Sequence, residues 1–334
     1  MRSLARSHAS RPTLSWPTLP ARLALVDELA RELEAKFGPG ILYRLARARP
    51  KVGAQVLSTG SLRLDRATGL GGVPRGRLTL LRGEASSGKT TLAYHLLAEA
   101  QRNGGLAALI DGEGSADLEA MLACGVDTSD LILGSPDDAR ETLEMVEMLV
   151  RCHALDAVVA TALPPGHSGL LALGLRRLGV WLKDSPTATI LVDEAGVGRW
   201  ELGGRSKTRF STPNSRLPSP ISHCASLVIE LRQVRPLFGP GGEVQGLRVR
   251  AEIVKNRQAS ACGLAELELA VGRGLRRAVE ALEIGLEGGL VQRALQGLIW
   301  RDRVLGRGPE AALAALEREP ELLDELVDDC LRLA

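Results

Sequence analysis

The feature that most limits how this chain can fold is a glycine-rich run, Gly83-Glu84-Ala85-Ser86-Ser87-Gly88-Lys89-Thr90. It matches the G-x-x-x-x-G-K-[ST] pattern of phosphate-binding loops. The apolar residues 78–81 before it are expected to form a buried strand, and residues 91–100 after it a helix. In that setting backbone N–H groups and the positive end of the helix dipole converge on a phosphate. The run therefore predicts a P-loop NTPase fold.

The same loop predicts its ligand, which we expect to be ATP with Mg²⁺. Lys89 would reach the β- and γ-phosphates, and the Thr90 hydroxyl would hold the metal ion. The other loop residues expected to contact the nucleotide are Gly83, Ser86, Ser87, Gly88 and Thr91. Glu113 follows the next predicted strand, where a carboxylate can activate a water molecule. Lys89 and Glu113 are therefore the candidate catalytic residues.

Strands and helices alternate after the loop. We expect strands at 107–110, 131–133, 155–160 and 188–192, and helices at 116–123, 139–152 and 170–183. Such alternation predicts an α/β fold with a mostly parallel twisted sheet that is flanked by helices. Three later strand-like runs, 225–231, 247–254 and 264–271, have no helix between them, which predicts an antiparallel extension of the sheet.

The pattern also predicts four parts of the chain. Residues 1–20 read as a flexible leader, 21–58 as an N-terminal helical segment, 59–271 as the ATPase core and 272–334 as a small α-rich C-terminal domain. The N-terminal helix is expected at 21–37, and the last helix at 321–333.

Charge and cysteine content limit the partners and the compartment. The 334 residues include 42 basic and 40 acidic side chains, which leaves a net charge of +2. Any contact with nucleic acid must therefore come from a local patch. The five cysteines are scattered, and no apolar export region follows the N-terminal arginines. The longest uncharged run, 157–175, is interrupted by prolines and glycines. These features predict a cytoplasmic protein with no membrane contact.

The acid that organises the metal ion is harder to assign. Residues 155–160 have the apolar character of a Walker B strand, but the strand ends in Thr161, which could contact the metal only through a bound water. Residues 190–192 lead into Asp193 and Glu194, which look like a Walker B acid followed by a catalytic glutamate. The residues alone leave open which of the two strands lies beside the P-loop.

Several runs together resemble the bacterial RecA recombinase family: 57–65, 72–77 and 83–91, with further similarity at 25–40, 110–126, 225–226 and 254–257 and in the C-terminal sixty residues. The similarity covers about residues 22–333. It implies a RecA-like ATPase core with an N-terminal helix and a small C-terminal domain. It also implies that Glu113 is the catalytic glutamate, that Asp117 contacts adenine, and that Lys255 and Arg257 reach the ATP of a neighbouring subunit.

The departures from that family bear on function. Thr161 stands where the family has its Walker B aspartate, and Glu194 stands where the family has the glutamine that couples ATP to DNA. The interface lysine and phenylalanine fall at Ser222 and His223. The first DNA-binding loop, 161–167, is about a dozen residues shorter than the family's version, which argues against strand exchange.

The second DNA-binding loop is expected at 196–220. It combines basic side chains with an aromatic ring, which suits phosphate contact and base stacking on single-stranded DNA. A basic loop also suits a protein partner with an acidic face. The residues expected to bind DNA are Arg199, Arg205, Lys207, Arg209, Phe210 and Arg216.

With these departures the chain resembles a RecA paralogue of the ImuA type. That resemblance implies a role in SOS mutagenesis and translesion synthesis with weak ATPase activity. The implied partners are RecA, a Y-family polymerase homologue of the ImuB type, single-stranded DNA and a further copy of the chain. Two alternatives stay open. One is a divergent DNA-dependent ATPase that performs RecA-type strand exchange, and the other is a P-loop ATPase of another RecA-core branch, such as a helicase or a clock-type ATPase.

Overall fold

The computed structural model describes residues 18–37, 55–102, 104–161, 168–194, 220–239, 241–260 and 263–333. The chain divides into two units, Met1–Gly53 and Ala54–Ala334. The described part of the first unit is dominated by one helix, α1 (Leu19–Phe37), which confirms the helix expected at 21–37. It exposes Leu25, Val26 and Leu29.

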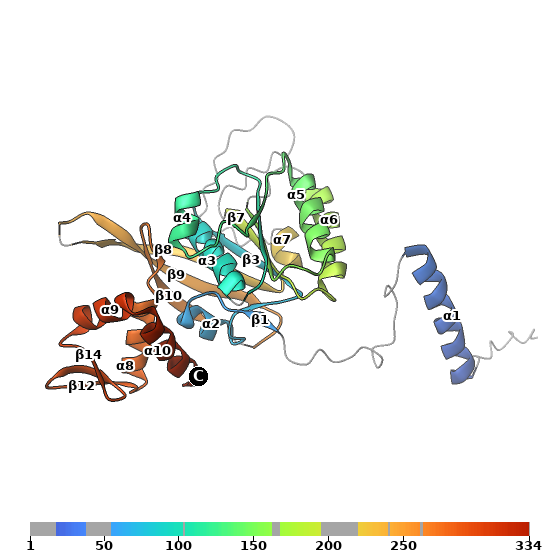
Figure 1. The fold of residues 1–334 in the computed structure, drawn as a ribbon. Helices are drawn as coiled ribbons and strands as arrows, with labels where there is room; N and C mark the ends of the chain where they lie inside the picture. The colour runs from blue at the N-terminus through green and yellow to red at the C-terminus, as the bar shows by residue number, and fades with distance from the viewer. Residues whose placement is uncertain are drawn as a thin grey trace, which may run out of the picture. The chain divides into compact units, whose positions relative to one another are not determined.

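The second unit is built on one large sheet, shown in Figure 1. Over the described residues it has nine strands in the order β11-β10-β9-β8-β3-β7-β6-β4-β5. The six strands from β8 to β5 run parallel to one another, and β9, β10 and β11 add on antiparallel. The strands are β3 (Leu78–Gly83), β4 (Ala107–Asp111), β5 (Ile132–Gly134), β6 (Ala157–Thr161), β7 (Ala188–Glu194), β8 (Leu227–Phe238), β9 (Val244–Asn256), β10 (Leu264–Ala270) and β11 (Gly274–Leu275). Both the predicted α/β class and the antiparallel extension are confirmed.

Helices cover both faces of the parallel part. On one face lie α3 (Lys89–Arg102) and α4 (Leu118–Ala123), and on the other α5 (Ala139–Arg151), α6 (Ser168–Leu182) and α7 (Pro220–Cys224), as Figure 1 shows. Because side chains alternate along a strand, each central strand contributes side chains to the cores on both faces of the sheet. Leu109 and Val159 pack with α3, whereas the adjacent Ala108 and Val158 belong to the core on the α5–α6 face. This explains why β4 and β6 are apolar along almost their whole length.

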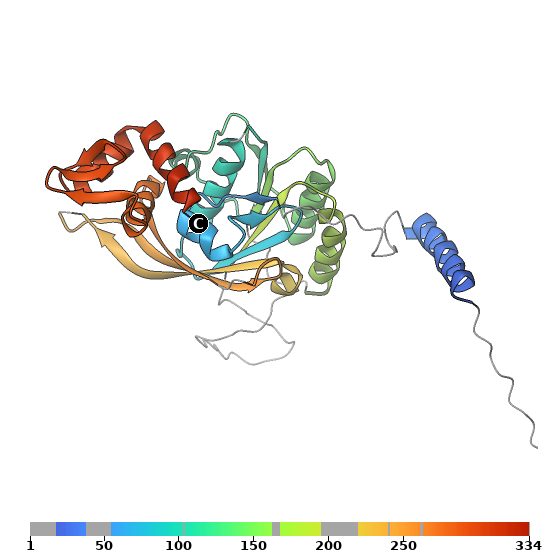
Figure 2. The ribbon, with the colours of Figure 1, turned by 90° about the horizontal axis from the view of Figure 1, so that it is seen from below.

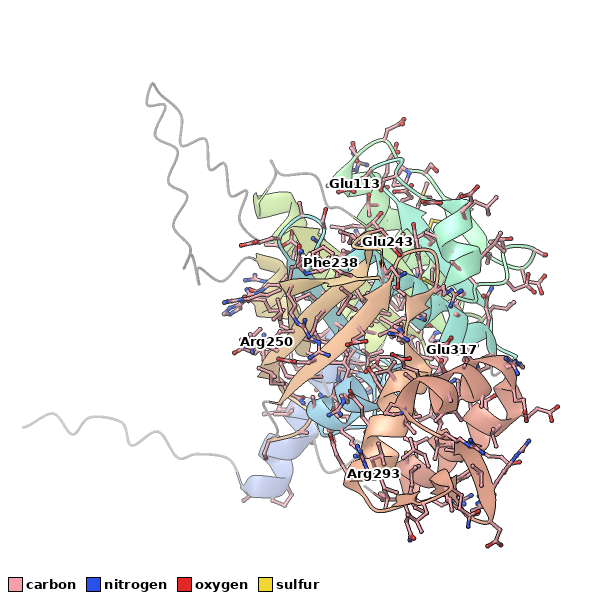
Figure 3. All side chains as sticks on the ribbon, turned by 90° about the vertical axis from the view of Figure 1, so that its left-hand side faces the viewer. Glu113, Phe238, Glu243, Arg250, Arg293 and Glu317 are labelled. Atoms are coloured by element: carbon pink, nitrogen blue, oxygen red, sulfur yellow. The ribbon has the colours of Figure 1, made fainter. Side chains whose placement is uncertain are left out.

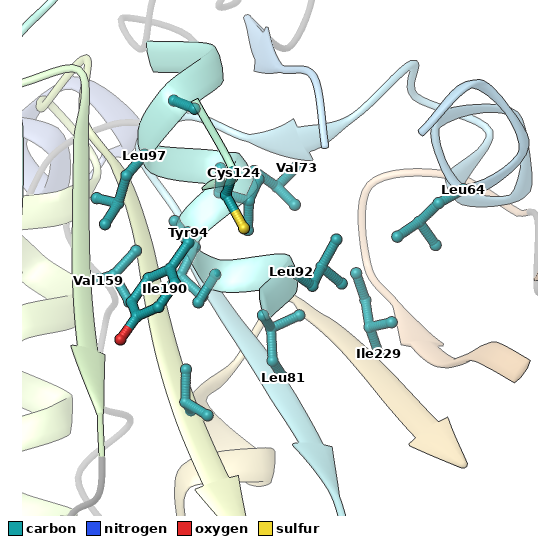
Figure 4. Close-up of a cluster of buried hydrophobic side chains, with 14 of the residues drawn as sticks. Leu64, Val73, Leu81, Leu92, Tyr94, Leu97, Cys124, Val159, Ile190 and Ile229 are labelled. Carbon is teal, nitrogen blue, oxygen red and sulfur yellow. The ribbon is translucent and has the colours of Figure 1, made fainter. Parts of the chain in front are cut away.

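The core beneath α3 is drawn in Figure 4. Leu92, Tyr94 and Leu97 of α3 lie over Leu81, Val159 and Ile190 of the sheet, and all are buried. A short pair of strands, β1 (Val56–Leu57) and β2 (Val73–Pro74), and the helix α2 (Leu62–Thr68) complete this part. This packing fixes α3, the helix that follows the P-loop, relative to β3, β6 and β7.

The C-terminal elements surround a hydrophobic cluster that includes Trp300, Leu316 and Leu326. They are α8 (Arg277–Glu287), β12 (Val291–Ala294), β13 (Gly297–Trp300), β14 (Arg303–Gly306), α9 (Pro309–Arg318) and α10 (Pro320–Arg332). Figure 2 shows them beside α2 and the β8–β10 strands. The last helix lies where expected, but the three-stranded antiparallel sheet β12-β13-β14 was not predicted. No helix within the described ranges is long and apolar enough to cross a membrane.

Candidate nucleotide-binding site

The P-loop joins β3 to α3, as its sequence predicts, and two of its glycines are required by close packing. A Cβ atom on Gly83 would lie 2.3 Å from the carbonyl oxygen of Leu231 on the adjacent β8. Gly88 has φ +89°, and a Cβ there would lie 2.3 Å from Cδ1 of Leu269. A side chain at Gly83 would displace the loop from β8, and one at Gly88 would have to adopt a left-handed backbone conformation that glycine tolerates.

Lys89 is the predicted site residue of the loop whose contacts are best defined. It is buried, and its Nζ atom donates hydrogen bonds to the carbonyl oxygens of Gly83 at 3.0 Å and Glu84 at 2.7 Å. The ammonium group is thus held over the loop where phosphates would bind. Ser87 is also buried, and its Oγ atom has no hydrogen-bond partner within the described residues. Ser86 and Thr90 are exposed.

These features fit a nucleotide phosphate chain. The loop presents a buried ammonium group and a buried hydroxyl that has no hydrogen-bond partner within the described residues, at the start of a helix. The exposed Thr90 hydroxyl can hold Mg²⁺ together with the phosphates. Across the described residues, no cluster of His, Cys, Asp and Glu side chains is arranged as a metal site of its own.

The strand order shows which of the two candidate Walker B strands lies beside the P-loop strand. β7 lies directly beside β3 and pairs Arg82 with Asp193, whereas β6 is one strand further away. Asp193 alternates with Val192, which packs in the α3-side core, so Asp193 faces the α5–α6 side. Thr161 alternates with Ala160 of the α5–α6 core and therefore lies on the face of α3. Of these two residues, only Thr161 lies on the face of the P-loop helix.

Thr161 is buried, and its hydroxyl donates to Oδ1 of Asp111 at 3.0 Å. The two residues are register partners at the ends of β6 and β4. Asp111 was not among the predicted site residues. It directly precedes the segment that carries Glu113, which was the only available signal in the sequence.

Glu113 lies on the loop between β4 and α4 and is exposed. The Ser115 hydroxyl donates to its Oε2 atom at 3.3 Å, and Gly114, with φ +64°, allows the chain to reverse between them. Figure 3 shows Glu113 at the upper end of the core, away from the C-terminal elements that carry Arg293 and Glu317. An exposed carboxylate at the carboxyl edge of a parallel sheet is free to meet a ligand there.

Asp117 begins α4 as its N-cap. Its Oδ1 atom accepts a hydrogen bond from the Ala120 backbone N–H at 3.1 Å, and its own backbone N–H donates to the Tyr94 hydroxyl at 3.2 Å. Burial raises the pKa of Tyr94. These contacts fix the start of α4 against the P-loop helix α3, and they leave the adenine contact expected of Asp117 as a prediction.

Lys255 and Arg257 converge on the end of α7. The Lys255 Nζ atom donates to the carbonyl oxygens of Ser222 at 2.7 Å and His223 at 3.0 Å, and Arg257 Nη2 donates to that of His223 at 3.2 Å. Burial, together with the nearby Arg257 charge, lowers the pKa of Lys255. In this chain the two cations therefore cap α7, and their predicted role toward a neighbouring subunit's ATP stays a prediction.

The predicted DNA-binding side chains, Arg199, Arg205, Lys207, Arg209, Phe210 and Arg216, lie outside the described residues. Most of the shortened first loop, residues 162–167, also lies outside them. The described structure therefore brings together the P-loop, Thr161, Asp111 and the loop of Glu113 and Asp117 at one edge of the sheet.

Comparison with known proteins gives the same family that the motifs resemble. A family model described as the RecA N-terminal domain matches residues 24–167. The chain is 36% identical over 322 residues to protein RecA of Thermus thermophilus. That match covers 91% of this chain and 92% of the relative. It is 36% identical over 319 residues to protein RecA of Rubrobacter xylanophilus, with 90% of each chain covered, and 32% identical over 313 residues to that of Chloroflexus aurantiacus. The chain belongs to the RecA family.

Proposed function

We propose that this protein is an ATP-binding member of the RecA family that acts in bacterial DNA repair and damage tolerance and hydrolyses ATP slowly. The observation that carries this proposal is the contrast between its two nucleotide motifs. The P-loop is complete and holds Lys89 over the phosphate cradle. The strand end expected to supply the metal-organising carboxylate instead carries Thr161, which has no charge and donates a hydrogen bond to Asp111.

The roles of the side chains follow from this geometry. The P-loop N–H groups would bind the phosphates, and Lys89 would exchange its two carbonyl contacts for phosphate oxygens. Bound Mg²⁺ would supply positive charge to the phosphates, held at the Thr90 hydroxyl. Glu113 would orient a water molecule and accept its proton. With no carboxylate at Thr161, the metal ion lacks its usual anionic anchor, so we expect slow turnover.

The proposed biological role is SOS mutagenesis by a RecA paralogue of the ImuA type, with RecA, an ImuB-like Y-family polymerase homologue and single-stranded DNA as partners. The shortened loop at 161–167 and the replacement of the interface lysine and phenylalanine by Ser222 and His223 support a role other than strand exchange. In this role ATP binding would matter more than ATP turnover.

A second candidate is a divergent recombinase with DNA-dependent ATPase activity and RecA-type filaments. The similarity to protein RecA extends over 91% of this chain and 92% of the relative, including the C-terminal elements, which favours a retained RecA activity.

One experiment separates the two functions. ATP turnover by the purified full-length protein should be measured with and without single-stranded DNA, while the same samples are imaged by electron microscopy. The proposed function predicts slow turnover with little stimulation and no regular filaments. Strong stimulation by DNA together with filaments would favour the recombinase.

The DNA contact is tested separately by charge reversal of Arg205, Lys207 and Arg209. If the segment contacts phosphates, the triple variant should bind single-stranded DNA more weakly, and its affinity should depend less steeply on salt. The matched control reverses three exposed residues elsewhere, Arg140 and Arg318 on helices and Lys183 just after α6. Equal loss in both triple variants would indicate only a general charge effect, and no loss in either would favour a protein partner for the segment.

A further inference from the structure

Asp111 is a buried carboxylate at the end of β4, on the face of the sheet that α3 covers. It is only 4% exposed and accepts three hydrogen bonds. Its Oδ1 atom accepts from the Thr161 hydroxyl at 3.0 Å and from the Glu113 backbone N–H at 3.2 Å, and its Oδ2 atom accepts from the Ala116 backbone N–H at 2.7 Å. Burying a carboxylate is costly unless such donors compensate it. The three donors therefore fix the orientation of this group.

The donors come from two different parts of the fold. Thr161 ends β6, whereas Glu113 and Ala116 belong to the loop that follows β4. A backbone contact joins the same two parts, because the Gly112 N–H lies 3.4 Å from the Thr161 carbonyl oxygen. The Asp111 carboxylate is thus the side-chain link between the end of β6 and the loop that presents Glu113.

The location of this link is significant. Asp111 and Thr161 are paired in register at the carboxyl edge of the sheet, on the face covered by α3. Thr161 occupies the strand end where a carboxylate would organise the metal ion, and the nearest buried carboxylate is that of Asp111 on the next strand. Because the single O–H of Thr161 donates a hydrogen bond to Asp111, its hydroxyl oxygen can serve only as an acceptor toward a water molecule.

We infer that Asp111 is a positioning residue for ATP hydrolysis, which locks the Glu113 loop to Thr161 at the end of β6. This inference rests on the proposed ATPase function. Asp111 acts through its neighbours: it holds the Glu113 backbone so that the exposed carboxylate faces the nucleotide, and it directs the Thr161 oxygen toward water. Removing its charge should loosen both groups without weakening ATP binding at the P-loop.

The test compares four variants of the full-length protein. Asp111→Asn keeps the size but offers only one acceptor oxygen, so one of the two backbone N–H groups, of Glu113 or of Ala116, loses its partner. Thr161→Val removes the hydroxyl at nearly constant shape, and Thr161→Ser keeps it. The matched control is Asp127→Asn, because Asp127 is exposed and accepts a backbone N–H, that of Ser129, in a loop away from these strand ends.

Three quantities should be measured for each variant: the Kd for a fluorescent ATP analogue with Mg²⁺, kcat for ATP hydrolysis, and amide hydrogen exchange of residues 112–117 without nucleotide. We expect Asp111→Asn to lower kcat by about 10- to 100-fold, the range found for outer residues that orient catalytic groups. The Kd should change little, and exchange of the 112–117 amides should rise about tenfold or more as the loop opens locally. Thr161→Val should raise exchange in the same segment, and Thr161→Ser should restore protection.

The outcomes separate this inference from the proposed function. If wild-type protein hydrolyses ATP but Asp111→Asn changes neither kcat nor loop exchange, Asp111 is not a positioning residue. If kcat and affinity fall together, its role is general folding, and the inference is again overturned. If wild-type protein shows no turnover at all, the proposed ATPase fails, and unchanged exchange in Asp111→Asn and Thr161→Val would still reject the link itself.

Discussion

The hydroxyl of Ser61 donates to both carboxylate oxygens of Glu280, at 2.8 and 2.9 Å, although the two residues are 219 positions apart. Ser61 is the N-cap of α2, and Glu280 lies in the first turn of α8. Glu280 is buried, yet it borders a cavity of about 560 Å³ between α2, β10 and α8, away from the P-loop. The contact therefore ties α8 to the start of α2.

This contact should make the stability of the protein depend on pH. Burial raises the pKa of Glu280 from 4.5 to about 7, against the opposing effect of the Ser61 hydrogen bonds. Because the folded pKa lies above the unfolded value, the stabilisation is complete below the unfolded pKa and is lost as pH rises through about 7. Asp65, whose pKa burial raises to about 6, contributes with the same sign.

The first prediction concerns Glu280→Gln, which stays neutral and can still accept from Ser61. As pH rises from about 4.5 to about 7, its free energy of unfolding should fall less than that of wild type, with a difference of about 1–3 kcal/mol at the upper end. Urea unfolding across this pH range measures it, since Asp65 titrates in both proteins. Glu283→Gln, on the exposed side of the same helix, should follow wild type. Identical slopes for Glu280→Gln and wild type would contradict the prediction.

A second prediction concerns the close approach of the P-loop to β8. Gly83→Ala would bring a Cβ to 2.3 Å from the Leu231 carbonyl oxygen, and a backbone atom in a central strand cannot move aside easily. We expect a loss of about 1–3 kcal/mol in stability together with weaker ATP binding, because the whole loop must shift. Gly179→Ala on α6 is the control, since a Cβ there meets no atom within 4 Å. It should be neutral or stabilise the protein by up to about 1 kcal/mol. Equal stability of the two variants, measured by urea unfolding, would show that the loop tolerates the shift.

Much of this architecture could be predicted because it is encoded locally. The glycine pattern, the apolar run before it and the amphipathic run after it all lie within twenty-five residues of the P-loop, and each has one reading as strand, turn or helix. The long antiparallel strands β8, β9 and β10 were also predictable, because no helical segment separates them.

What could not be predicted depends on contacts between distant residues. The strands β12, β13 and β14 are four residues each, too short for alternation to distinguish them from loop. Asp111 and Thr161 are 50 residues apart, and only the strand order makes them neighbours. The same order shows that Asp193, which looks like a Walker B acid in the sequence, faces away from α3.

A third prediction concerns the end of α7. Lys255→Ala removes two hydrogen bonds from the last carbonyl groups of this five-residue helix, so the helix should fray. We expect faster amide hydrogen exchange in residues 221–226 and a loss of about 1–2 kcal/mol in stability. Lys255→Arg, which keeps a donor and the charge, should retain part of the amide protection and part of the stability. If Lys255 instead leaves α7 for the ATP of a neighbouring subunit, adding Mg·ATP to wild type should reproduce the faster exchange. Unchanged exchange in Lys255→Ala would show that α7 does not depend on this cap.

The fourth prediction tests the P-loop itself. Lys89 is the buried cation that the loop holds for phosphate, so Lys89→Ala should abolish both nucleotide binding and hydrolysis. A thermal unfolding series with Mg·ATP gives a direct readout, because a ligand that binds only the folded state raises Tm with its concentration. Wild type and Lys183→Ala, which alters an exposed lysine after α6, should both show the rise, and Lys89→Ala should show none. The variant also removes the Lys89 hydrogen bonds to the Gly83 and Glu84 carbonyl groups. Its Tm without nucleotide must therefore first be compared with that of wild type. A nucleotide-dependent rise in Lys89→Ala equal to that of wild type would mean that ATP binds elsewhere.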